Sequence, residues 1–155
     1  MPKTVVVMPA YNAAKTIEYT FRSIPTNCIE EVILGDDGTS DHTDRIAETL
    51  GSHTIRRPHN TGYGANQKTC YTIALRRDAE IVIMLHPDGQ YDPSIIPEMI
   101  HEIISGEADV VLGSRFLITG GPLNGGMPYY KYVSNRFLTM FENLVLHQNL
   151  LDYHI

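Results

Sequence analysis

The sequence predicts an α/β fold with three layers, in which helices cover both faces of a mainly parallel, Rossmann-like sheet. Short apolar runs rich in Val and Ile alternate along the chain with stretches whose apolar residues have helical spacing. Most of these runs are apolar at successive positions, as in strands that are buried on both faces of a sheet. The alternation therefore indicates parallel strands joined by helical crossovers.

Five apolar runs are expected strands, and the stretches between and after them are expected helices. The strands are residues 4–8, 31–34, 54–55, 80–85 and 109–112. The helices are residues 14–24, 46–50, 65–76, 96–103 and 133–145, and the last has one apolar face. Asn12 and either Ser40 or Asp41 are expected N-caps, and Asp92 is expected to cap a helix that starts at Pro93.

The chain has the size of one compact domain, with 155 residues of which 43% are hydrophobic and 19% charged. Residues 119–128 are rich in Gly and Pro and are expected to form a loop. We expect residues 1–118 to form the α/β core, and residues 119–155 to add this loop and the amphipathic helix to the same domain. Residues 152–155 contain no turn or cap, so we expect a truncated domain.

Composition argues against several classes of partner and site. The net charge is −6, from 12 Lys and Arg against 18 Asp and Glu, and the basic residues are scattered, so no nucleic-acid partner is expected. Cys28 and Cys70 stand apart, as expected for buried thiols in a reducing compartment rather than for a zinc site. No apolar run approaches the roughly 20 residues of a membrane-spanning helix. The expected location is the cytoplasm.

Polar loops follow the first four expected strands, at residues 9–12, 35–41, 60–64 and 86–90. The carboxyl ends of parallel strands gather at one edge of a sheet, where ligands bind in open α/β folds. The pattern therefore predicts one binding site made by four loops, although each loop alone is also typical of an ordinary turn. The full dinucleotide fingerprint and the GxxxxGK phosphate loop are both absent, which disfavours nicotinamide-dependent and ATP-hydrolysing enzymes.

Five segments together carry a family pattern: residues 9–12 (PAYN), 36–41 (DDGTSD), 60–65 (NTGYGA), 86–93 (HPDGQYDP) and 113–116 (GSRF). In order and spacing they resemble glycosyltransferase family 2, and most closely its dolichol-phosphate mannose synthase-like branch. The resemblance implies the GT-A nucleotide-diphospho-sugar transferase fold, with residues 1–118 as the nucleotide-sugar-binding core. It also implies inverting transfer of a hexose from a UDP- or GDP-sugar donor to a polyprenyl-phosphate or saccharide acceptor, in the synthesis of cell envelope glycans.

The resemblance places a set of strand-end residues at the nucleotide. They are Pro9, Ala10, Tyr11, Asn12, Asp36, Asp37, Gly62, Gly64, Ala65 and Pro87. It puts the Tyr11 ring near the base, and the Asp37 carboxylate where it accepts hydrogen bonds from the base or the ribose. For Tyr11 the alternative is a loop aromatic that caps the sheet. For Asp36, bracing of its own loop and contact with the ligand stay open.

The metal motif of the family is altered in this chain. Members carry Asp-x-Asp, whereas this sequence has His86, Pro87 and Asp88. The resemblance implies that Asp88 is catalytic and binds a divalent cation, Mg²⁺ or Mn²⁺, which neutralises the donor diphosphate. His86 is either a second ligand, better suited to Mn²⁺, or a hydrogen-bonded residue at the strand end.

The C-terminal segment is expected to serve the acceptor. Asp152 begins a stretch that resembles the start of the family motif Asp-x-x-Ser/Thr-Gly-Phe-Arg, and the resemblance implies a catalytic role for it. A lipid phosphate is already ionised, so only a sugar hydroxyl acceptor would need a base. Residues 127–150 are expected to pack in the core or to mediate self-association. Relatives place this region toward the membrane, which implies peripheral association of the full-length protein with the inner membrane face.

Two other functions stay open at this point. A sugar nucleotidyltransferase has a related fold, but its glycine-rich first loop with Arg and Lys is missing here. A non-catalytic nucleotide-sugar-binding domain would be consistent with His86 and with the truncated end. Such a domain would show no metal-dependent hydrolysis of the donor.

Overall fold

The computed structural model describes residues 1–114, 123 and 127–150. The chain forms two compact units, Met1–Asp109 and Val110–Ile155, and each is described by itself.

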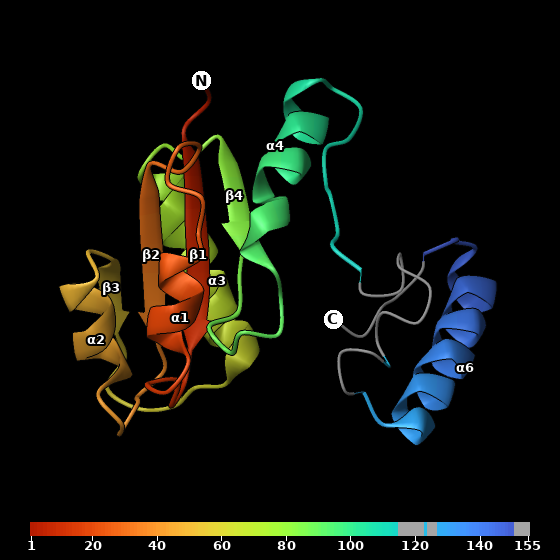
Figure 1. The fold of residues 1–155 in the computed structure, drawn as a ribbon, viewed down its shortest axis with the longest axis horizontal. Coiled ribbons are helices and arrows are strands. Elements are labelled where there is room, and N and C mark those ends of the chain that lie inside the picture. Colours follow the sequence, from red (N-terminus) through yellow and green to blue (C-terminus); the bar gives the residue numbers. More distant parts are fainter. Residues whose placement is uncertain (115–122, 124–126, 151–155) are drawn as a thin grey trace. The chain divides into compact units, whose positions relative to one another are not determined.

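The first unit is built on a parallel sheet of four strands in the order β3-β2-β1-β4 (Figure 1). The strands are β1 (Thr4–Ala10), β2 (Glu31–Asp36), β3 (His53–Arg56) and β4 (Ile81–Met84). All seven residues of β1 are buried, because β1 has a neighbour on each side and helices on each face. The predicted parallel sheet, buried on both faces, is confirmed.

Helices cover the two faces of the sheet, with α1 (Ile17–Arg22) in front and α3 (Tyr63–Arg76) behind in Figure 1. Behind the sheet, Cys70 and Ala74 of α3 pack against a fully buried group on β1 and β2: Val5, Val7 and Ile33. In front, α1, α2 (Thr43–Thr49) and α4 (Ile96–Ile104) share a larger core cluster with the opposite side chains of the sheet. The three-layer α/β/α arrangement is therefore confirmed.

The first residues of α1, α2 and η1 can be compared with the N-caps expected from the sequence. The 3₁₀ turn η1 (Pro93–Ile95) precedes α4, and Asp92 accepts the Ser94 N–H at 2.9 Å, which confirms the cap at Asp92. The expected N-cap at Ser40 or Asp41 is wrong, because His42 is the N-cap of α2, although Oδ1 of Asp41 accepts the N–H of Thr43, the first residue of the helix, at 3.2 Å. The expected cap at Asn12 is wrong, because α1 begins only at Ile17 and the side chain of Asn12 bonds another loop.

The expected strand at residues 109–112 is wrong. Among the described residues no ladder includes this segment, and Val110 and Leu112 are 74% and 53% exposed. Apolar composition alone does not make a strand, because a strand exists only through hydrogen bonds to a neighbouring strand.

The second unit contains α6 (Tyr129–Leu146), which confirms the helix expected from the apolar spacing of residues 133–145. Its apolar residues are largely exposed, and Thr139 is its buried residue. No helix within the described part of the chain is long and apolar enough to cross a bilayer.

Candidate functional site

The loops after β1 and β2 are joined by hydrogen bonds into one element. Asn12 has a positive φ of 51°, and its Oδ1 accepts the Ser40 N–H at 3.1 Å. The Ala14 N–H donates to Oδ2 of Asp41 at 2.9 Å, and the Thr43 hydroxyl donates to Oδ1 of Asp41 at 2.6 Å. Burial alone would raise the pKa of Asp41, but the hydrogen bonds from Thr43 and Ala14 lower it below its usual value. The ionised Asp41 carboxylate thus ties the first loop to the start of α2.

The Tyr11 side chain is exposed beside these two joined loops. Its neighbour Ala10 is the last residue of β1, and the Ala10 carbonyl accepts the Asp37 N–H at 3.0 Å. Tyr11 itself is 54% exposed. A fixed backbone with an exposed aromatic ring suits stacking on a planar ligand group.

Asp36 closes the turn that follows β2. It is only 3% exposed, and its Oδ1 accepts the Thr39 N–H at 3.3 Å. Burial raises the pKa of Asp36 above its usual value, although the hydrogen bonds from Thr39 act in the opposite direction. The sequence left two roles open for Asp36, and this hydrogen bond corresponds to the bracing of its own loop.

Asp37 is 2% exposed and holds the loop that leads into α3. Its Oδ1 accepts the Thr61 N–H at 3.0 Å and the Thr61 hydroxyl at 2.9 Å, and its Oδ2 accepts the Gly62 N–H at 2.9 Å. Arg57 lies 3.5 Å from Oδ1 and also bonds the Thr61 and Thr69 hydroxyls. Burial opposes ionisation of Asp37, but the bonds from Thr61 and Gly62 and the charge of Arg57 outweigh it, so the pKa is lowered. Asp37 is therefore an ionised carboxylate at neutral pH.

At the start of α3, the backbone of Gly62 and Gly64 is accessible, with free space around it. Gly62 has a φ of +91°, and a Cβ at Gly62 or Gly64 would meet no atom within 4 Å. One turn into the helix, Asn66 is buried, and its Nδ2 donates to the carbonyls of Gly35 at 2.7 Å and Ala10 at 3.4 Å. Asn66 therefore joins the ends of β1 and β2, and its own Oδ1 has no hydrogen-bond partner within the described part of the chain.

The loop after β4 carries the altered metal motif. Asp88 is exposed, and its Oδ1 accepts the Gln90 N–H at 2.9 Å. Nε2 of His86 lies 3.2 Å from the Tyr63 hydroxyl, and the two rings stack with centroids 5.4 Å apart. The described residues contain no group of three or more His, Cys, Asp or Glu side chains that could hold a metal ion. One carboxylate fits a Mg²⁺ or Mn²⁺ ion that is held jointly with water and the phosphates of a ligand.

The structure brings most of the predicted site residues to one edge of the sheet, in the loops after β1, β2, β3 and β4. Pro9 and Pro87 are buried, whereas Asn12, Gly62 and Gly64 are exposed. Ala65 is half-buried in the first turn of α3. The predicted catalytic residue Asp152 lies outside the described residues.

Four residues that matter to this edge were not predicted as site residues, although Asp41 was an expected N-cap. Asp41, Arg57 and Tyr63 make the contacts described above, and each bonds a residue that is distant in the chain. The fourth, Asn66, had a local signal, because it lies four residues before Cys70 and eight before Ala74 on the buried side of α3.

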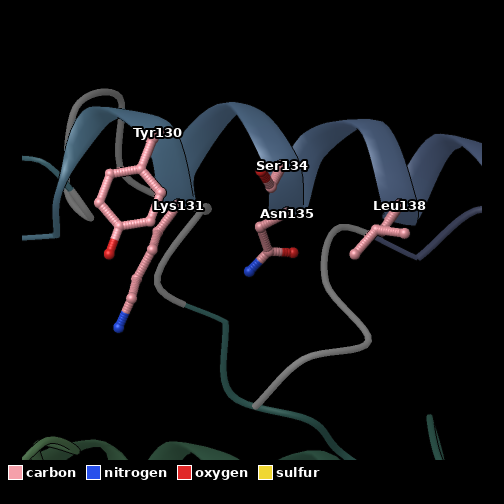
Figure 2. Close-up of a pocket in the computed structure, with 5 residues that line it drawn as sticks. All are labelled: Tyr130, Lys131, Ser134, Asn135 and Leu138. Atoms are coloured by element: carbon pink, nitrogen blue, oxygen red, sulfur yellow. The ribbon is translucent and has the colours of Figure 1, made fainter.

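The second unit has an open hollow beside the first half of α6 (Figure 2). Its lining comes from this single helix: Tyr130, Lys131, Ser134, Asn135 and Leu138. None of the predicted nucleotide or metal residues is among them, and the hollow combines one cation with mainly uncharged groups. It therefore does not compete with the sheet edge as the candidate site.

Comparison with known proteins gives consistent matches. The sequence profile of glycosyl transferase family 2 matches residues 5–154. The low-salt glycan biosynthesis hexosyltransferase Agl6 of Haloferax volcanii is 31% identical over an alignment of 159 positions. The alignment covers 99% of this chain and 37% of that protein. The UDP-N-acetylglucosamine–dolichyl-phosphate N-acetylglucosaminyltransferase of Methanococcus voltae is 27% identical over 157 residues, which cover 90% of this chain and 62% of that protein.

Solved structures share the fold. Glucosyl-3-phosphoglycerate synthase from Mycobacterium tuberculosis, in complex with Mn²⁺, UDP and glucosyl-3-phosphoglycerate, superposes with a TM-score of 0.56 at 23% identity. The match covers 68% of this chain and 41% of that one. The predicted GT-A fold is thus confirmed, and this chain spans between 37% and 62% of the length of the three proteins compared.

Proposed function

The chain belongs to glycosyl transferase family 2, and we propose that it binds the nucleoside diphosphate of a sugar donor for inverting hexosyl transfer. One observation carries the proposal. The exposed Tyr11, the ionised Asp37 and the exposed Asp88 follow three adjacent strands, β1, β2 and β4, at the same edge of the sheet. A stacking ring, a buried acceptor and an exposed carboxylate are the groups that a base, a ribose and a metal diphosphate require.

The nucleoside end of the donor is assigned to the loops after β1 and β2. Tyr11 stacks on the base, and Ala10 and Asn12 shape the backbone around it. Among the described residues, Oδ2 of Asp37 accepts only the Gly62 N–H, which leaves one acceptor position for an N–H of the base or a ribose hydroxyl. Gly62 and Gly64 let the backbone approach the ligand, because neither position carries a side chain.

The diphosphate end is assigned to Asp88. Its Oδ1 is engaged by the Gln90 N–H, so Oδ2 is the atom that would hold a cation. When bound, Mg²⁺ or Mn²⁺ neutralises the negative charge that develops on the departing nucleoside diphosphate. The Mn²⁺ and UDP in the mycobacterial synthase support this assignment. His86 is the second candidate ligand, and its Nε2 is already near the Tyr63 hydroxyl.

The acceptor is proposed to be a polyprenyl phosphate or a saccharide. The names of the two archaeal relatives, a glycan biosynthesis hexosyltransferase and a dolichyl-phosphate transferase, support these classes. Asp152 is the proposed acceptor-side residue. Residues 127–150 are the proposed surface for peripheral membrane association or for self-association.

Calorimetric titration with UDP and GDP, in Mn²⁺ and in EDTA, tests the donor site. We expect Mn²⁺ to strengthen nucleotide binding, and Asp88→Asn to reduce that strengthening by about 10-fold or more. The variant keeps an oxygen for the Gln90 N–H and removes the charge. Asp92→Asn is the matched control, because it removes a nearby charge while asparagine still caps η1. Equal affinity in Mn²⁺ and EDTA, or an unchanged Asp88→Asn variant, would contradict the assignment.

A further inference from the structure

Tyr63 joins the start of α3 to the loop after β4. It is the first residue of α3 and directly follows Gly62, whose N–H is held by Asp37. Its hydroxyl lies 3.2 Å from Nε2 of His86 and 3.4 Å from Sδ of Met84. Its ring also stacks on the imidazole, with an angle of 23° between the planes. Both the ring and the hydroxyl of Tyr63 thus contact the residue that begins the Asp88 loop.

The same aromatic cluster closes the other end of that loop. His86 also lies against Tyr91, with ring centroids 5.7 Å apart. Asp88 stands between these two residues in the sequence, and its Oδ1 accepts the Gln90 N–H inside the loop. The loop is therefore held at both ends by rings and in the middle by one hydrogen bond.

Met84 anchors this cluster to the sheet. It is the last residue of β4, and its Sδ also accepts from Nε2 of Gln67, one turn after Tyr63 on α3. The position of His86 is therefore set by contacts with α3 as well as by β4. A shift of Tyr63 would move the loop that carries Asp88 relative to Asp37.

We propose that Tyr63 is a positioning residue that couples the Asp37 end of the donor site to the Asp88 end. The inference rests on the proposed function, since it assigns Asp37 to the nucleoside and Asp88 to the metal diphosphate. Through the stack with His86, Tyr63 holds Asp88 at the place where its carboxylate would bind a cation. Tyr63 itself touches neither the cation nor the reacting atoms.

The test is calorimetric titration of the whole chain with UDP and GDP, in Mn²⁺ and in EDTA. Tyr63→Phe keeps the ring and removes the hydroxyl, whereas Tyr63→Ala removes both. We expect the gain in affinity from Mn²⁺ to fall about 3-fold for Tyr63→Phe and about 10-fold for Tyr63→Ala, from the usual strength of one hydrogen bond and one aromatic pair. Affinity in EDTA should stay within about 2-fold of wild type, because the Asp37 side is unchanged.

Matched variants separate positioning from a general loss of structure. Tyr71→Phe removes a hydroxyl from the same helix, and we expect it to leave the Mn²⁺ gain unchanged. In an Asp88→Asn background, Tyr63→Ala should cause no further loss of that gain, because the residue it positions is already disabled. Thermal unfolding of each variant shows whether the fold is intact.

An equal loss in Mn²⁺ and EDTA, or a full further loss in the Asp88→Asn background, would overturn the role of Tyr63. Wild-type binding that gains nothing from Mn²⁺ would refute the proposed function and this inference together. A wild-type gain that persists in both Tyr63 variants would refute the inference alone.

Discussion

Asp36 and Asp37 are adjacent in the sequence, and we predict that replacement with asparagine destabilises the protein at Asp37 but not at Asp36. In Asp37→Asn, one carboxylate oxygen is replaced by an amide NH2 group, which donates hydrogen bonds and cannot accept an N–H. The variant then loses either the bond from Gly62 or the pair of bonds from Thr61, and it also loses the charge that faces Arg57. In Asp36→Asn, the remaining oxygen still accepts the Thr39 N–H.

The magnitudes follow from these contacts. A hydrogen bond to a charged group contributes about 1.5–3 kcal/mol, and Asp37 is 2% exposed, so little water replaces a lost bond. We expect Asp37→Asn to lower the free energy of unfolding by about 2–4 kcal/mol at pH 7. Burial raises the pKa of Asp36, so folding disfavours its charged form. Asp36→Asn is therefore expected to be neutral or stabilising, by about 1 kcal/mol at most.

Urea unfolding between pH 3 and pH 8 measures both effects. The pKa of Asp37 is lowered in the folded protein, so its ionised form adds stability that is fully present above the unfolded pKa of about 3.9. That stability is lost as the pH falls through the folded pKa, and the gap between wild type and Asp37→Asn should narrow there. A gap of under about 0.5 kcal/mol at pH 7 would refute the reasoning. So would a gap that is independent of pH, or an Asp36→Asn variant as destabilised as Asp37→Asn.

Two further predictions concern the contact between α3 and the sheet. Gly35→Ala should destabilise the protein by about 2–4 kcal/mol in the same unfolding assay, because the new Cβ would lie 2.4 Å from both Asn66 Oδ1 and Cys70 Sγ. Gly64→Ala is its control and should cost nothing, since that Cβ meets no atom within 4 Å; equal costs for the two variants would exclude the clash. Burial raises the pKa of Cys70 to about 11, so in a thiol titration at pH 8 only the half-buried Cys28 should react before unfolding. Rapid modification of both thiols in the folded protein would contradict the burial of Cys70.

The sequence was sufficient to predict the parallel sheet and the edge that carries the loops. Both depend on local patterns, because a buried strand is apolar at successive positions and polar residues follow directly where it ends. The same reasoning fails at residues 109–112, where the apolar run predicts a strand that the structure does not contain. Among the described residues that run has no hydrogen-bonded neighbour, and the existence of a neighbour is not a local property.

By itself, the sequence determined the order of the four sheet strands and the helices between them, the position of Tyr11, Asp37 and Asp88 at strand ends, and the family. Only the tertiary structure decided which of two adjacent aspartates is held ionised, and that His86 lies against Tyr63. The deciding contacts join residues far apart in the chain, since Thr61 follows Asp37 by 24 positions and His86 follows Tyr63 by 23. The charge state of a buried carboxylate depends on the donors and charges that the packing brings within hydrogen-bond distance, and residue order does not specify them.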